Sequence, residues 1–182
     1  VHKSVLMGLI LSGATPVYVM PEYSTKWQMW GGVTPETIEK AFAETPDAKA
    51  VLLVSPTYYG LCSDLQAIAE ICHCHNAALL VDEAHGSHLY FSEQLPLGAL
   101  ESGADACAQS IHKTAGSFTQ SSFLSLGSGR LDEARVAANL QMVQSTSPSY
   151  LLMASLDAAR RGMALPPKCA PVNSSPPLPE YQ

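Results

Sequence analysis

The sequence predicts an α/β fold with three layers (α/β/α) and a mainly parallel sheet. Helical and strand patterns alternate along the chain, and the candidate strands are short and almost wholly apolar. Such strands are typical of a parallel sheet that helices cover on both faces. Polar residues follow directly after several of these strands. Because ligands of such sheets bind beyond the carboxyl ends of the strands, those residues are the first candidates for a site.

The first predicted helix and strand lie near the start of the chain. Lys3–Leu11 can form a helix, and Gly13 after it suits the left-handed conformation at a helix C-terminus. We expect the apolar side chains of this helix in the core rather than at an interface; they are Val5, Leu6, Leu9 and Ile10. Thr15–Met20 (TPVYVM) is expected to form a short strand.

Two capped helices flank the next strand. Thr34-Pro35 combines an N-cap with proline at the first helical position, so a helix is expected from there to about Ala43. The apolar run Ala50–Ser55 (AVLLVS) predicts a strand buried on both faces of the sheet. Ser63-Asp64 then caps a helix that extends to about His75.

The remaining elements continue this alternation. Ala78–Val81 (ALLV) predicts a second buried strand, which runs into Asp82. Two more short strands and two helices complete the prediction, over residues 105–109, 122–126, 131–143 and 148–162. From Pro166 the chain is rich in Pro and Ser, which is typical of a disordered tail or linker. We therefore predict a domain over residues 1–163 and a tail over residues 164–182.

The charge and the apolar runs of the chain limit which partners we expect. The net charge is −6 and no basic run could follow a phosphate backbone, so nucleic acid is not expected. The longest apolar runs fall far short of the roughly 20 residues that cross a bilayer. No export signal is visible, so we expect a cytoplasmic location with the five cysteines reduced. Charged residues are only 14% of the chain, which suggests that further chain or a partner covers part of the surface.

Two polar residues after the strands suggest a chemistry. Lys113, within SIHKT, has neighbours suited to imine formation with an aldehyde cofactor and to phosphate binding, and burial would lower its pKa enough to make it a nucleophile. Asp82 would enter the same crevice. Enzymes of pyridoxal phosphate (PLP) use such a carboxylate to keep the pyridine nitrogen protonated. The local sequence alone also allows a solvated surface lysine at Lys113 and, at Asp82, a helix N-cap or a turn residue.

Consecutive motifs resemble the ornithine/lysine/arginine decarboxylase family, which has the aspartate-aminotransferase-type fold of PLP enzymes. They are SPTYYG (55–60), VDEAHGSH (81–88), QSIHKT (109–114) and QSTSPSYLLMASLDAARR (144–161). The opening VHKS and the segment GGVTPETIEKA are also similar to the family. The resemblance covers roughly residues 1–163, and it makes the chain look truncated at both ends relative to the family.

The resemblance implies roles for individual residues. Lys113 would carry PLP as a Schiff base, Asp82 would pair with the pyridinium nitrogen, and His2 would stack on the ring. The other implied cofactor contacts are His85, Ser110, His112 and, more weakly, Thr57. The implied reaction is decarboxylation of lysine, arginine or ornithine to the amine and CO2. The family also implies a small-molecule amino-acid substrate and a homo-oligomer for the full-length enzyme.

Several alternatives stay open at this point. The family's phosphate-binding turn lies upstream of His2 and its smaller C-terminal domain is absent, which also suits an inactive relative acting as an interaction partner. Aminotransferases and β-eliminating lyases share the aspartate and lysine pair, although QSTSPSYLLMASLD favours a decarboxylase. Residues 72–75 (CHCH) could suggest a metal site. Neighbours on a helix point in different directions, so none is expected there.

Overall fold

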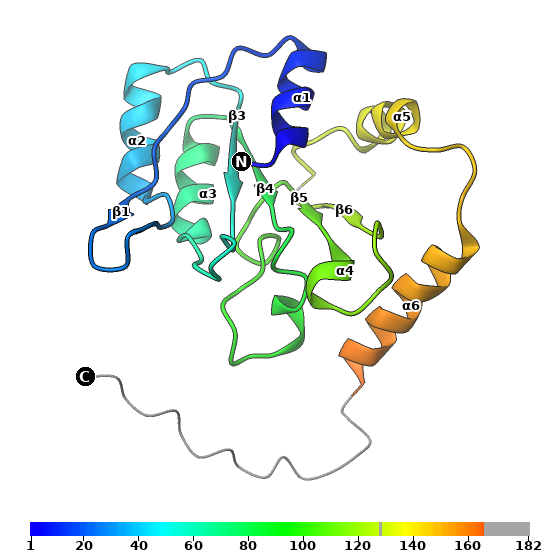
Figure 1. The fold of residues 1–182 in the computed structure, drawn as a ribbon. Helices are drawn as coiled ribbons and strands as arrows, with labels where there is room; N and C mark the ends of the chain where they lie inside the picture. The colour runs from blue at the N-terminus through cyan, green and yellow to red at the C-terminus, as the bar shows by residue number, and fades with distance from the viewer. Residues whose placement is uncertain (128, 166–182) are drawn as a thin grey trace.

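The computed structural model describes residues 1–127 and 129–165. A four-stranded sheet in the order β3-β4-β5-β6 forms the centre of the fold (Figure 1). Its strands are β3 (Ala50–Val54), β4 (Ala78–Asp82), β5 (Ala106–Gln109) and β6 (Phe123–Leu126). The first three strands are parallel, and β6 pairs with β5 in the antiparallel direction. The prediction of a mainly parallel sheet is confirmed.

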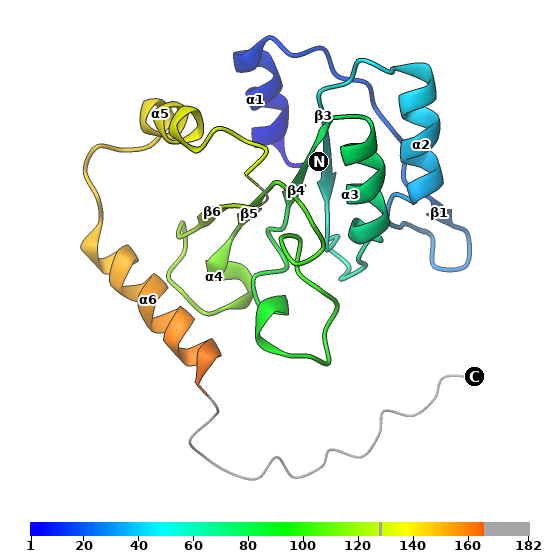
Figure 2. The same cartoon turned by 180° about the vertical axis from the view of Figure 1, so that it is seen from behind.

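Helices lie on both sides of this sheet in the view of Figure 1, with α2 and α3 on one side and α5 and α6 beyond β6 on the other; Figure 2 shows the same arrangement from behind. The helices are α1 (Lys3–Ser12), α2 (Pro35–Glu44), α3 (Leu65–Cys74), α4 (Ile111–Thr114), α5 (Glu133–Val143) and α6 (Tyr150–Ala164). A 3-10 helix η1 (Leu89–Phe91) and a hairpin of β1 (Tyr23–Ser24) with β2 (Met29–Trp30) complete the described elements.

Most predicted elements are confirmed to within one or two residues. The predicted caps are observed as well: Thr34 accepts a hydrogen bond from the Thr37 amide, and Asp64 accepts one from Ala67. The predicted strand Thr15–Met20 is wrong, because that segment lies along the surface without a partner strand to complete its hydrogen bonds. The hairpin, η1 and the single turn α4 were not predicted.

The core lies between the sheet and the layer made by α3 and α2. Register places Leu53, Val81 and Cys107 in one row across β3, β4 and β5, and all three are buried. Ile68 and Cys72 of α3 belong to the same cluster of buried side chains and are fully enclosed. Strand side chains alternate between faces, so this row faces the α3 layer.

The other face of the sheet is more open. Leu52 is 39% exposed, and Ala108 is exposed as well. The expectation of burial on both faces is therefore wrong for β3, whereas on this same face Ala78 of β4 and Ala106 of β5 are buried. Val54, Asp82 and Ala108 form one row on this second face at the carboxyl end of the sheet.

Helix α1 corrects a second expectation. Its apolar residues were predicted to lie in the core, yet no residue of α1 is buried, and Ile10 is 71% exposed. Val5 and Leu9 are half-buried, whereas Leu6 is exposed. The helix is apolar as its sequence indicates, but composition alone does not tell whether the surface that would cover its apolar side lies within the same chain. Among the described residues, no helix has the length and apolar character needed to span a bilayer.

Candidate active site

The sheet brings three polar segments to one edge. The register pairs Val54 with Asp82 and Asp82 with Ala108, so the carboxyl ends of β3, β4 and β5 lie level with one another. Beyond these ends the chain continues into Thr57, His85 and Lys113, respectively. Parallel strands place these segments at the edge of the sheet where α/β proteins bind ligands.

Asp82 keeps part of its carboxylate open. The residue is half-buried at the end of β4, and its Oδ1 accepts a hydrogen bond from the Ala84 amide at 3.2 Å. In the described part of the chain, Oδ2 accepts no hydrogen bond. The predicted alternative of a turn residue is thus half correct, because one oxygen closes the local turn while the other remains free for a further donor.

Lys113 lies on the single-turn helix α4, directly after β5. Its amide donates to the Ser110 carbonyl at 3.0 Å, which fixes the backbone of the turn. The side chain is exposed and, among the described residues, makes no hydrogen bond or ion pair. The burial expected for Lys113 from the sequence is therefore not provided by the described residues.

His85 connects Asp82 and Lys113 electrostatically. The pKa of His85 is lowered, first by desolvation and second by the positive charge of Lys113, while the negative charge of Asp82 acts in the opposite direction. Its Nδ1 is buried and has no hydrogen-bond partner among the described residues. The ring also contacts Tyr58 edge-on, with 5.7 Å between centroids. A neutral imidazole with an unused polar atom thus lies near both charged groups.

The two predicted neighbours of Lys113 differ in their contacts. Ser110 is the N-cap of α4, but its hydroxyl makes no capping hydrogen bond. The ring of His112 is half-buried and is hydrogen-bonded through Nδ1 to the Ser121 carbonyl at 2.9 Å. A carbonyl only accepts, so Nδ1 carries the proton and Nε2 is the acceptor nitrogen of the neutral ring.

Thr57 and His2 make local contacts. The Thr57 hydroxyl accepts from the Leu61 amide at 3.2 Å, inside a turn that the Thr57 amide closes by donating to the Leu61 carbonyl. His2 is the exposed N-cap of α1, and its Nδ1 lies 2.8 Å from the Ser4 hydroxyl. The charges of Asp82 and Lys113 both act on the pKa of His85, whereas the described contacts of His2 stay within the start of α1.

Sequence reasoning missed Glu83, a fully buried carboxylate beside Asp82. It accepts hydrogen bonds from the Ala99 amide at 2.7 Å and from Tyr90 and Gln109 at 2.8 Å each. Burial raises the pKa of Tyr90, and burial followed by the negative charge of Glu83 raises the pKa of Cys107 to about 12. Only the pairing of an acidic residue with Asp82 in the sequence could have drawn attention to this position.

Gly86 brings the Asp82 loop close to the loop after β3. A Cβ atom at Gly86 would lie 2.6 Å from Glu83 Cγ and 2.7 Å from Pro56 Cδ, closer than real Cβ contacts allow. Glycine is therefore required for this close approach. The approach joins the ends of β3 and β4 into one wall of the candidate site.

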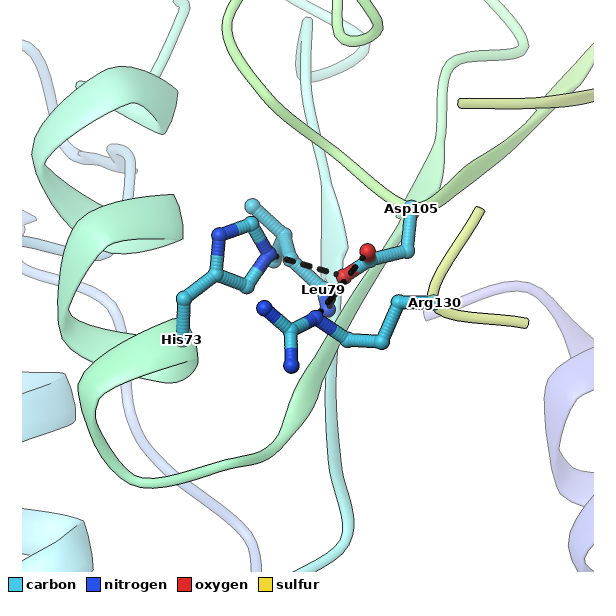
Figure 3. A network of polar contacts seen from close by, with 4 residues as sticks. All are labelled: His73, Leu79, Asp105 and Arg130. Carbon is cyan, nitrogen blue, oxygen red and sulfur yellow. Dashed lines mark hydrogen bonds and ion pairs between the residues drawn. The ribbon is translucent and has the colours of Figure 1, made fainter. Parts of the chain in front are cut away.

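A second polar cluster lies at the opposite, amino end of the sheet (Figure 3). Asp105 is fully buried and accepts from the Leu79 amide at 2.8 Å and from His73 Nε2 at 3.0 Å. Arg130 Nε lies 3.4 Å from the other carboxylate oxygen. Because its oxygens are occupied by protein groups and its place is the amino end, we interpret this cluster as structural.

The residues at the carboxyl edge fit PLP by their chemistry. Asp82 offers a free oxygen for a protonated pyridine nitrogen, and Lys113 offers an unpaired amine for an aldehyde. The buried, unpartnered Nδ1 of His85 lies with them and can donate to or accept from a ligand. The described residues contain no cluster of three or more side chains suited to holding a metal ion.

Comparison with known proteins gives a family match over nearly the whole chain. The family model for Orn/Lys/Arg decarboxylase, major domain, matches residues 1–167. An arginine decarboxylase of Halalkalibacterium halodurans is 48% identical over 164 residues, covering 90% of this chain and 33% of the relative. The arginine decarboxylase of Bacillus subtilis is 45% identical, covering 90% and 34%. The chain therefore spans about a third of the length of these relatives.

More distant matches extend the comparison. Lysine decarboxylase LdcA of Pseudomonas aeruginosa is 29% identical over 91% of this chain and 25% of its own length. Among solved structures, a SepCysS–SepCysE N-terminal domain complex superposes with a TM-score of 0.66 at 14% identity, covering 90% of this chain and 45% of that one. Mouse CSAD superposes with a TM-score of 0.60 at 24% identity, covering 91% and 34%. These structures confirm the predicted α/β fold class.

Proposed function

The chain belongs to the Orn/Lys/Arg decarboxylase family, and on that premise we propose that it forms the cofactor-binding part of a PLP-dependent decarboxylase of basic amino acids. The observation that carries the proposal is the meeting of Asp82, His85 and Lys113 at the carboxyl edge of the parallel sheet. The family match supports this reaction class, and Asp82, His85 and Lys113 are residues of the kind that the class needs.

Each of the three residues has a distinct part in the proposal. Bound PLP supplies an electron sink for the electron pair left at Cα when CO2 departs. Asp82, through its open oxygen, would accept a hydrogen bond from the protonated pyridine nitrogen, and Lys113 would hold the cofactor through its amine. His85, whose pKa is lowered, would pack against the ring or offer its unpartnered Nδ1 to the cofactor. Ser110 and His112 line the same edge, with Thr57 and His2 as further proposed contacts.

We propose arginine as the first substrate to test. The relatives at 43–48% identity that carry an activity name are called arginine decarboxylases, whereas the lysine decarboxylase is 29% identical. Purified chain is incubated with PLP and each of arginine, lysine and ornithine, and the amine and CO2 are quantified. Release of a keto acid or ammonia without CO2 would instead assign an aminotransferase or a lyase.

A spectroscopic titration tests the site directly. The 182-residue chain is titrated with PLP beside Lys113→Ala and, as a matched control, Lys40→Ala, which removes an exposed lysine of α2. We expect a saturable visible imine band in the parent and in the control, and complete loss of that band in Lys113→Ala. Borohydride reduction followed by peptide mapping should place the cofactor on Lys113.

Two outcomes would contradict this function. A band that survives in Lys113→Ala would move the cofactor to another lysine. The absence of any saturable band in the parent would favour the alternative of an inactive relative that acts through interactions.

We also propose a cytoplasmic location and self-association of the complete enzyme. The exposed apolar residues of α1, α5 and α6 support association, and sedimentation of the purified protein would test it.

A further inference from the structure

A hydrogen bond connects the two halves of the candidate site. The Ser87 hydroxyl lies 2.5 Å from the Thr114 hydroxyl, so one donates to the other. Ser87 belongs to the loop that carries Asp82 and His85, whereas Thr114 is the last residue of α4 and follows Lys113 directly. This contact therefore reaches from the segment with the carboxylate to the segment with the amine.

Other hydrogen bonds fix the start of the Asp82 loop, and the Ser87 hydroxyl makes the contact at its far end. At the base, the Glu83 amide donates to the Ala108 carbonyl at 2.9 Å, and the Glu83 carboxylate accepts from Gln109 of β5 at 2.8 Å. Ser87 lies at the other end of the loop and is only 4% exposed. A hydroxyl in that position needs a partner, because a buried unpaired group costs free energy.

Helix α4 is held on both sides of Lys113. His112 is tied through Nδ1 to the Ser121 carbonyl, and Thr114 is tied to Ser87. Between them, the Lys113 side chain has no hydrogen bond or ion pair in the described part of the chain. The backbone that carries the amine is thus fixed, while the amine itself remains available.

We propose that Ser87 and Thr114 are positioning residues that set the spacing between Asp82 and Lys113. This inference rests on the proposed function, because the spacing matters only if both groups hold one cofactor. The hydroxyls act through the two segments that they join: the loop end that follows Asp82 and the helix end that follows Lys113. A ring nitrogen and an aldehyde carbon lie at a fixed separation in PLP, so a rigid spacing favours simultaneous contact with both.

The first experiment needs no cofactor. Amide hydrogen exchange is measured on the parent chain, on Thr114→Val, which removes the hydroxyl at nearly constant volume, and on Thr114→Ser, which keeps it. The reporters are the Gly86 and Lys113 amides, which donate to the carbonyls of Glu83 and Ser110, respectively. The Leu79 amide, bound to Asp105 at the opposite end of the sheet, is the internal control.

In Thr114→Val we expect both reporters to exchange on the order of tenfold faster, since one buried hydrogen bond is lost. Leu79 should be unchanged, and Thr114→Ser should restore the parent rates. Ser87→Ala should resemble Thr114→Val, and the double variant should be no worse than either single variant because both remove the same bond. Unchanged reporter rates, or a uniform rise that includes Leu79, would overturn the proposal.

The second experiment measures cofactor affinity in the same variants. We expect the apparent dissociation constant for PLP to rise on the order of tenfold in Thr114→Val and to return to the parent value in Thr114→Ser. Equal affinity in all three proteins would overturn the positioning role even if the exchange rates differ. If the parent itself shows no imine band, the proposed function fails. The exchange rates still decide whether the Ser87–Thr114 hydrogen bond holds the two segments together.

Discussion

Each end of the sheet carries an aspartate, but the two carboxylates differ in how many protein groups they bind. At the amino end, the buried Asp105 carboxylate is occupied by Leu79, His73 and Arg130. At the carboxyl end, the Asp82 carboxylate is half-buried with one oxygen open, and Lys113 lies nearby without a partner among the described residues. Saturated polar groups hold a structure together, whereas open ones remain available to a ligand.

Because of this difference, we expect substitutions at the amino end to lower stability and substitutions of Asp82 or Lys113 at the carboxyl end to change function. Taking a carboxylate out of water costs free energy that only close donors offset, so Asp105 depends on its partners. Asp82 keeps contact with solvent and needs fewer internal donors. The following predictions test this separation and run from the largest expected effect on the free energy of unfolding to the smallest.

Asp105→Ala should produce the largest loss of stability. Removing the carboxylate leaves the Leu79 amide unpaired inside the protein and His73 and Arg130 without their acceptor, at a cost of about 3 kcal/mol. Denaturant unfolding measures this loss, with Asp47→Ala at an exposed loop position as the control. A change in the free energy of unfolding below about 1 kcal/mol would show that the amino-end cluster contributes little to stability.

Glu83→Gln tests whether the carboxyl end is open throughout. Glu83 accepts from three donors, and a glutamine amide presents only one acceptor oxygen and turns an NH2 group toward a donor. We expect a loss of roughly 1–3 kcal/mol in the free energy of unfolding. The exposed Glu70→Gln of α3 is the matched control. Equal stability of the two variants would contradict the assignment of Glu83 as an anchor of the Asp82 loop.

Sequence reasoning found the polar groups that remain open and missed the saturated carboxylates Asp105 and Glu83, for a physical reason. Asp82 and Lys113 each follow an apolar strand, so their place at the edge can be predicted locally. The partners of Asp105 and Glu83 come from distant segments, and only the folded register brings His73 or Gln109 to them. The same limit applies to α1, whose helix was predicted correctly while the burial of its apolar side was not.

Asp82→Asn should change function with little change in stability. The asparagine Oδ1 can still accept from Ala84, so we expect the free energy of unfolding to change by less than about 1 kcal/mol. The neutral amide no longer favours a protonated pyridine nitrogen, so PLP should be retained less tightly and its bound spectrum should shift. Unfolding curves and PLP titrations on one preparation measure both quantities. Parent-like PLP affinity and spectrum would remove Asp82 from the proposed site.

The smallest effect is also a cofactor-free test of the site: the pKa of His85 should respond to both charged neighbours in opposite directions. Lys113→Met removes a positive charge that disfavours protonation, so the pKa of His85 should rise toward its ordinary value. Asp82→Asn removes a negative charge that favours protonation, so that pKa should fall further. NMR titration of the histidine ring protons measures both shifts, with the ring of His2 at the end of α1 as the internal control.

Protonation of His85 should also affect stability with a definite sign. Because its pKa is lower in the folded chain than in the unfolded chain, the unfolded state binds more protons as the pH falls below the ordinary histidine value. Stability should therefore decline with acidification through that range, less steeply in Lys113→Met and more steeply in Asp82→Asn. Identical His85 titrations in parent and variants would mean that the three residues do not share one site, and the contrast between the two ends of the sheet would lose its functional half.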